Sequence, residues 1–348
     1  DHGFDAYDPT VDARISHEFA AAAYRFGHSL IAQTMTVIDA NGDPQQIPLT
    51  DIFLNPTNDD EAFTLPIEQL QQYGYTPQPG YEQVGVNGVI EGISGQPAEE
   101  VDYNIVDAVR DDLVRIRADL FAFNVARGWD VGLGTLNQVR ADLLKSSDPY
   151  VRAAVDGVDA DFTPYNSWED FRARNGLSLT VMAQLMAAYP DLELQTPEEI
   201  AAFEAANPDT DLHGPGGNVV RGIDRLDLWV GGLAEAHTNG GMVGSTFWVI
   251  LHEQFDRLQE GDRFYYLDRV DNFDFYEQIE DQTFADIIER NTGLQGLSDD
   301  IFSTSVDDDD NDGDADNDGD AGDGDNGDDD SGANDSGNNG GDDESGDD

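Results

Sequence analysis

The residues best suited to chemistry in this chain are a histidine and an arginine three positions apart. His28 and Arg25 lie in residues 15–31, where apolar side chains recur at helical spacing on two opposite sides. That pattern predicts a helix buried on both faces. A neutral imidazole inside such a helix is either a core residue bonded to a backbone carbonyl or an axial metal ligand. In the second case Arg25 would neutralise an anionic group on the same cofactor, and spacing alone leaves both interpretations open.

A second pair of polar residues, Asn124 and Arg127, falls on one face of a predicted buried helix in residues 119–140. An unpaired buried amide costs about 1–3 kcal/mol, so Asn124 needs a hydrogen-bond partner. His17 precedes His28 by eleven residues, which is about 16 Å along a helix, so the two cannot ligate one metal from the same side. We therefore expect His17 at the surface, and we expect His213 in an exposed turn.

The C-terminal run 307–348 consists of Asp, Gly and Asn with a few small residues, and nothing in it is apolar beyond Ala. Such a run cannot bury a core, so we predict that it is disordered on its own. Its residues Asp314, Asp316, Asp318 and Asp325 match ligand positions of a calcium loop, although Glu is usual at the last of them. A chance match is expected in so acidic a run. An ordered calcium site and a solvated acidic spacer both remain open.

The overall charge limits the partners that this chain can bind. The sequence has 17 basic and 73 acidic residues, giving a formal net charge of −56. A chain this acidic repels nucleic acid and anionic membranes, so we exclude both as partners. The same charge is typical of a protein that must stay soluble in high salt. There are no cysteines, so disulfides and thiolate chemistry are excluded, and no run of residues is apolar enough to predict a membrane span.

Three stretches, in order along the chain, resemble the animal-type haem peroxidases. The string EFAAAAYRFGHSLI is similar to the proximal-histidine helix of that family. The string DLFAFNVARGWDVGLGTLNQVR is similar to its LN-x-x-RGRDHG-x-x-x-YN-x-x-R motif, with Trp129 and Val131 where the family usually has Arg and His. The region from Gly222 to Asp268 is similar to the family's DLWVGGL and EQF-x-RL-x-x-GDRF motifs. The resemblance covers most of residues 5–302.

This resemblance implies a mainly α fold: a partial haem peroxidase domain over residues 1–302 and an acidic tail over 303–348. His28 would be the proximal ligand of a haem b, whose covalent attachment stays open. Arg25 and Arg127 would lie at the haem propionates. Asn124 would accept the free N–H of His28, which sets its tautomer and basicity. The implied reaction reduces hydrogen peroxide and oxidises a halide or a small organic donor, in a secreted protein.

The family places its distal histidine, its distal arginine and its calcium loop before the proximal helix. Only 27 residues precede His28, and we find no matching arrangement among them. The distal histidine is the acid and base that helps to break the O–O bond. We therefore expect the proximal portion of a peroxidase and assign no catalytic acid or base. The alternative is a non-catalytic secreted adhesion or calcium-binding protein that retains the scaffold. The oligomeric state is left open.

Overall fold

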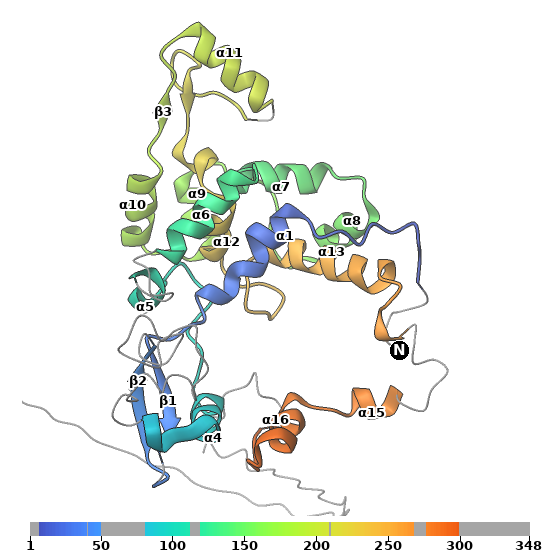
Figure 1. Ribbon diagram of the computed structural model, residues 1–348. Coiled ribbons are helices and arrows are strands. Elements are labelled where there is room, and N and C mark those ends of the chain that lie inside the picture. Colours follow the sequence, from blue (N-terminus) through green and yellow to red (C-terminus); the bar gives the residue numbers. More distant parts are fainter. Residues whose placement is uncertain are drawn as a thin grey trace, which may run out of the picture. The chain divides into compact units, whose positions relative to one another are not determined.

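The computed structural model describes residues 7–39, 41–49, 81–111, 119–208, 210–267 and 276–298, with the side chains of 81–86 left aside. The tail, its four candidate calcium ligands and the domain boundary at 302/303 lie outside these ranges. The elements follow in chain order (Figure 1): α1 His17–Ala21, η1 Ala23–His28, β1 Thr34–Ile38, β2 Pro44–Pro48, α4 Tyr81–Ser94, α5 Asp107–Asp111, α6 Leu120–Asp130, α7 Leu136–Lys145, α8 Pro149–Gly157, α9 Trp168–Asn175, α10 Leu179–Ala188, β3 Leu192–Glu193, α11 Pro197–Ala206, β4 Val219–Val220, η3 Gly222–Arg225, α12 Leu228–Leu233, α13 Ser245–Gly261, α15 Tyr276–Glu280 and α16 Phe284–Thr292.

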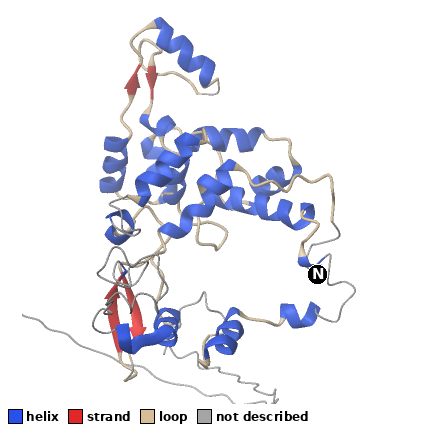
Figure 2. Ribbon diagram, viewed as in Figure 1, coloured by secondary structure: helices blue, strands red, loops and turns tan. Residues whose placement is uncertain are grey.

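The predicted mainly α fold is confirmed, since helices dominate the described chain and the strands form only two short pairs (Figure 2). The main core gathers side chains from α1, α7, α9, α12 and α13, with Phe19, Leu136, Phe171, Trp229 and Phe247 among them. α12 is buried along its whole length. Its Gly232 lies directly against the Phe247 ring, where a Cβ would overlap the ring atoms. The glycines of the WVGGL string therefore let α12 and α13 pack closely.

The predicted helix over residues 15–31 is confirmed only in part, because the helical residues run from His17 to His28 and the chain breaks at Ala22. Ala22 has φ −132° and ψ −76°, and the following six residues wind as the 3-10 helix η1. Ser16 caps α1 as expected, its hydroxyl accepting the Phe19 N–H. The break keeps Ala22 and Ala23 in the core but turns Tyr24 outward, 58% exposed. The segment is thus not buried on both faces.

Two further expectations about burial are also corrected. Apolar periodicity predicts that Phe123 of α6 and Phe255 of α13 are buried, but their exposed fractions are 52% and 49%. Phe255 instead stacks edge-on against Phe19 and Tyr24, with ring centroids 5.6 and 6.1 Å away. These aromatic contacts occupy the outer side of the junction between α1, η1 and α13.

The hairpin expected at Asn41–Gly42 is present: β1 and β2 pair antiparallel, with Thr34 opposite Pro48, and Gly42 takes φ 86° in the turn. α4 lies against β1, and its Gly92 comes so close to the Thr36 backbone that a Cβ would overlap it. The abundance of Gly, Pro and Tyr over residues 73–95 predicts a loop, and this prediction is wrong for residues 81–94, where α4 forms. Gly92 instead lets this helix lie directly on a strand.

α11 extends from the paired strands β3 and β4, and none of its residues is buried (Figure 1). Its start matches the sequence expectation: Thr196 forms a capping box with Glu199, and Pro197 is the first helical residue. Its end is tied to α7, because the Gln138 amide donates to Asn207 Oδ1 at 2.7 Å.

One buried ion pair joins four parts of the helical body. The guanidinium of Arg140 on α7 lies 2.7 Å from Glu235, and both side chains are fully buried. Arg140 also donates to Ser245, to Thr246 and to backbone carbonyls of residues 161 and 163. The Tyr165 hydroxyl donates to the same carboxylate at 2.9 Å. Every polar atom of the pair has a partner, which is the condition for tolerating charge inside a core.

Candidate functional site

His28 is the last residue of η1, and the winding of η1 aligns it with Arg25. A 3-10 helix has three residues per turn, so side chains three positions apart lie on one side. η1 contacts α12 and α13, which fixes the backbone under both residues. The Arg25 side chain folds back so that Nε donates to the Ala20 carbonyl at 3.0 Å. The break at Ala22 therefore places an imidazole and a guanidinium side by side.

Asn124 of α6 completes a chain of three side chains. Arg25 Nη1 donates to Asn124 Oδ1 at 2.7 Å, and Asn124 Nδ2 lies 2.8 Å from His28 Nδ1. Asn124 is fully buried, so both ends of its amide need these partners. The partner that the sequence required for Asn124 is thus confirmed, and one of its two partners is His28. Arg25 is the second, which the sequence did not indicate.

The orientation of the Asn124 amide determines the tautomer of His28. An amide nitrogen donates only, so in this arrangement His28 Nδ1 accepts and the ring proton lies on Nε2. A half-turn of the amide would present Oδ1 to His28 and would favour the tautomer with a free lone pair on Nε2. Arg25 would then lose its acceptor on Asn124. One amide orientation therefore bonds both Arg25 and His28, and the other bonds His28 alone and leaves the Arg25 guanidinium to another acceptor.

The charges around His28 favour a neutral imidazole. Burial lowers the pKa of His28, and the positive charge of Arg25 lowers it further. The pKa of Arg25 is itself lowered by burial and by the charge of Arg127. Within the described ranges no carboxylate lies at ion-pair distance from Arg25, whereas Arg127 pairs with Asp130 at 3.0 Å on the surface. The site therefore carries an uncompensated positive charge next to a potential ligand nitrogen.

This donor set fits a cofactor that combines a metal with anionic groups. A neutral imidazole is a common metal ligand. Two neighbouring guanidiniums suit carboxylates, since Arg can bind a carboxylate through two parallel hydrogen bonds. Haem meets both requirements through its iron and its propionates.

The other candidates from the sequence lie elsewhere. His17 is exposed, as expected. His213 is in the expected turn, but it is only partly exposed, and its Nε2 is 4.0 Å from the buried carboxylate of Asp224. In the described part of the chain, no group of three His, Cys, Asp or Glu residues could hold a metal ion. No helix there is long and apolar enough to span a bilayer.

Trp129, which departs from the family motif, has a defined role in the structure. Its indole N–H donates to Asp227 Oδ1 at 2.6 Å, and the Tyr189 hydroxyl donates to Asp227 Oδ2 at 2.7 Å. Burial and the neighbouring carboxylate raise the pKa of Tyr189. Asp227 directly precedes α12, so this cluster links the end of α6 to α10 and α12. The family motif has Arg at the position of Trp129, so the motif does not predict this cluster.

Comparison with known proteins gives a consistent result. The profile of the family described as animal haem peroxidase matches residues 1–200 and 192–302. Peroxinectin A of Dictyostelium discoideum is 26% identical over 298 residues, which cover 84% of this chain and 42% of that protein. Chorion peroxidase of Drosophila melanogaster is 27% identical over 267 residues, covering 75% of this chain and 24% of that protein.

Among solved structures, Peroxidase A from Dictyostelium discoideum superposes with a TM-score of 0.53 at 24% identity, over 85% of this chain and 43% of that one. This likeness supports the helical fold. The chain spans less than half the length of these relatives. The family profile covers most of the sequence, and the chain belongs to the animal haem peroxidase family.

Proposed function

We propose that this chain forms the proximal side of a haem peroxidase that reduces hydrogen peroxide and oxidises a halide or a small organic donor. The observation that carries the proposal is the Arg25–Asn124–His28 chain, with contacts of 2.7 and 2.8 Å. Family membership supports the use of haem. Bound haem supplies the electrons that reduce peroxide, and the residues of this chain hold and tune it.

Each residue has a separate task in this proposal. His28 ligates the iron through Nε2, which requires its ring proton on Nδ1. For Asn124 to accept that proton, its amide would have to turn so that Oδ1 faces His28, and Arg25 would then exchange its bond to Asn124 for one to a propionate. The bond from His28 to Asn124 would orient the ring and increase the electron donation of Nε2. Arg25 and Arg127 hold the propionates as counter-charges. No residue of the chain is assigned as the acid or base that acts on peroxide, so a distal side must complete the activity.

The proposal includes a location and an alternative. We place the protein outside the cell, a location that its similarity to proteins such as peroxinectin A and chorion peroxidase favours. The alternative is an adhesion or calcium-binding protein that keeps the scaffold without the chemistry. This alternative stays open because the matched region covers only 42% of peroxinectin A. Haem binding through His28 distinguishes the two.

The first test measures the visible spectrum of the chain after addition of haemin. We expect a Soret band typical of histidine-ligated haem in the wild type and its loss in His28→Gly. Added imidazole should restore the band in His28→Gly, because it can fill the space left by the side chain. His17→Gly is the matched control, since His17 lies in the same segment but is exposed. It should leave the spectrum unchanged.

Three results would contradict the proposal. A wild-type chain that takes up no haemin removes the peroxidase function and leaves the scaffold alternative. A Soret band that persists in His28→Gly assigns the ligand to another residue. Failure of peroxide to change the spectrum of haem-loaded chain, once a distal side is supplied, would show binding without the reaction.

A further inference from the structure

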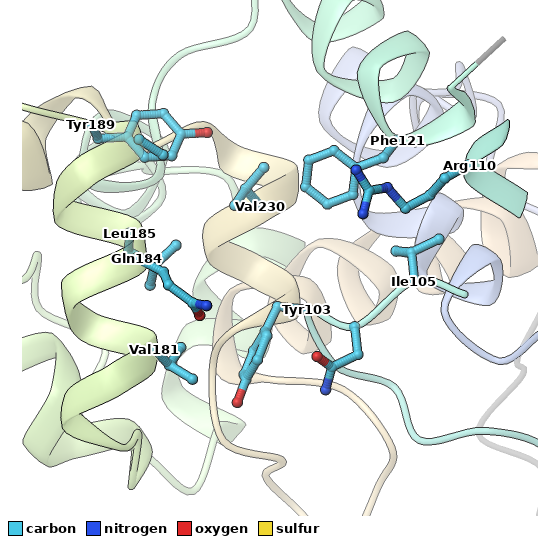
Figure 3. Close-up of a pocket in the computed structure, with 11 residues that line it drawn as sticks. Tyr103, Ile105, Arg110, Phe121, Val181, Gln184, Leu185, Tyr189 and Val230 are labelled. Carbon is cyan, nitrogen blue, oxygen red and sulfur yellow. The ribbon is translucent and has the colours of Figure 1, made fainter. Parts of the chain in front are cut away.

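A cavity of about 460 Å³ lies between α10, the start of α6, α12 and residues 103–110 (Figure 3). Its walls are mainly apolar, with the rings of Tyr103, Phe121 and Tyr189 among them. Figure 3 shows Val181, Gln184 and Leu185 along α10, facing Ile105, Arg110 and Phe121 across the space. The volume is within the range of about 300–1,000 Å³ that is usual for small-molecule sites. None of the residues of the His28 site lines it.

The charge of the lining is opposite to that of the chain. Acidic residues outnumber basic ones 73 to 17 in the sequence, yet Arg110 is the one charged residue among the described lining residues. Asn104 and Gln184 contribute amide groups, which can donate hydrogen bonds to an anion. A cavity with apolar walls and a single guanidinium is complementary to a ligand with an apolar body and one negative charge.

The described ion pair of Arg110 is weak enough for a ligand to replace it. Its ion pair with Asp119 is 3.7 Å long, and both side chains are substantially exposed. Exposed pairs of this kind contribute little, so a ligand carboxylate can replace Asp119 at small cost. The Tyr189 hydroxyl, in contrast, is committed to Asp227 at 2.7 Å and presents its ring to the cavity. The polar and apolar parts of the lining are therefore separated.

We propose that this cavity binds a small amphipathic organic anion: an aromatic or branched apolar body carrying one carboxylate or sulfonate. Arg110 pairs with the anionic group, and the rings of Phe121, Tyr103 and Tyr189 enclose the body. The site is separate from the haem site and does not depend on haem binding. It is joined to that site through α6, since Phe121 lies one helical turn before Asn124.

The test uses two fluorescent probes that share one aromatic body. 1-Anilinonaphthalene-8-sulfonate carries the anion, and N-phenyl-1-naphthylamine lacks it. Both are titrated into the haem-free chain. We expect saturable binding of the sulfonate at one site. Arg110→Gln should raise the Kd of the sulfonate about tenfold or more, which is the loss of one charge-assisted contact, and should change that of the neutral probe less than about twofold.

Two further variants separate this site from general effects. Arg152→Gln removes a matched guanidinium, because Arg152 also pairs at 3.7 Å with a carboxylate, that of Asp156, and both side chains are exposed. It should leave both affinities unchanged. Val181→Trp fills the cavity and should weaken both probes. Circular dichroism of each variant confirms that the helices are intact.

Several results would overturn the proposal. It fails if Arg110→Gln affects the two probes equally, or if Arg152→Gln weakens the sulfonate as much. It also fails if Val181→Trp has no effect while the protein stays folded, or if the sulfonate binds at several equivalent sites. Because every measurement is made without haem, these results are independent of the outcome of the haem-binding test.

Discussion

At the scale of single residues, Asn124 is the side chain on which the candidate site depends most. It is fully buried, and its two polar atoms bond to Arg25 and His28, which lie about a hundred residues earlier in the chain. A buried amide with both ends paired holds its neighbours in one geometry. Removing the Asn124 amide would leave the partly buried guanidinium of Arg25 and imidazole of His28 without this hydrogen-bond partner.

We therefore expect Asn124→Leu to lower the free energy of unfolding by about 1–3 kcal/mol, which is the cost of leaving buried polar groups unpaired. Urea unfolding of the haem-free chain, followed by circular dichroism, measures this change. Asn291→Leu is the control, because Asn291 is exposed on α16 and its amide reaches only a carbonyl of its own helix. A loss no larger than that of the control would show that the chain of contacts does not stabilise the fold.

At the scale of elements, the buried pair of Arg140 and Glu235 joins α7 to the segment between α12 and α13. The guanidinium also lies 4.4 Å from the Phe162 ring centroid and 4.6 Å from that of Tyr165. Charge in a dry core is tolerated only while both partners are present. The contact is therefore a point where one substitution affects several elements at once.

We expect Arg140→Met to lower the free energy of unfolding by about 3–5 kcal/mol, because it leaves the Glu235 carboxylate buried without its counter-charge. Arg152→Met, on the surface of α8, should change it by less than about 0.5 kcal/mol. Urea titration compares the two. The double variant Arg140→Met with Glu235→Leu should be more stable than Arg140→Met alone. If the double variant is the less stable one, the loss of stability in Arg140→Met comes from lost packing and not from the unpaired charge of Glu235.

The elements that could be predicted from the sequence are those fixed by local chemistry. Ser16 and Thr196 are of the residue types that cap helices, and each accepts a nearby backbone N–H as that type predicts. Thr283, which the sequence does not single out, caps α16 in the same way. The Asn41–Gly42 turn follows from the positive φ that Gly tolerates. α4 could not be predicted, because glycine disfavours helices by about 1 kcal/mol and only the contact of Gly92 with β1 explains it.

In the candidate site, too, the residues could be predicted from the sequence, whereas the contacts that depend on packing could not. The resemblance to the family motifs selects His28, Asn124 and Arg25, and the structure brings these three side chains together. The break at Ala22 and the hydrogen bond between Arg25 and Asn124 depend on packing across distant segments, which spacing does not encode. Arg127 is near enough to lower the pKa of Arg25, but its hydrogen bond goes to Asp130. Its role at a propionate stays a prediction.

At the scale of the whole molecule, net charge is the dominant property. The chain carries a formal charge of −56, and 20 of its 73 acidic residues lie in the run 307–348. The remaining residues still carry a large negative excess. Like charges repel more strongly in the compact state than in the unfolded chain, so this excess opposes folding. Salt weakens that repulsion, since the screening length falls from about 10 Å at 0.1 M to about 3 Å at 1 M.

We expect the free energy of unfolding to rise by at least about 1 kcal/mol when sodium chloride is increased from about 0.1 M to about 1 M. Urea unfolding followed by circular dichroism measures this change without adding a charged denaturant. Tetramethylammonium chloride at equal ionic strength is the control, because general screening does not depend on which cation is used. Equal stability at low and high salt would contradict the inference that this chain is adapted to salt. If sodium chloride alone raises the free energy of unfolding, the stabilisation comes from specific binding of sodium to carboxylates and not from screening.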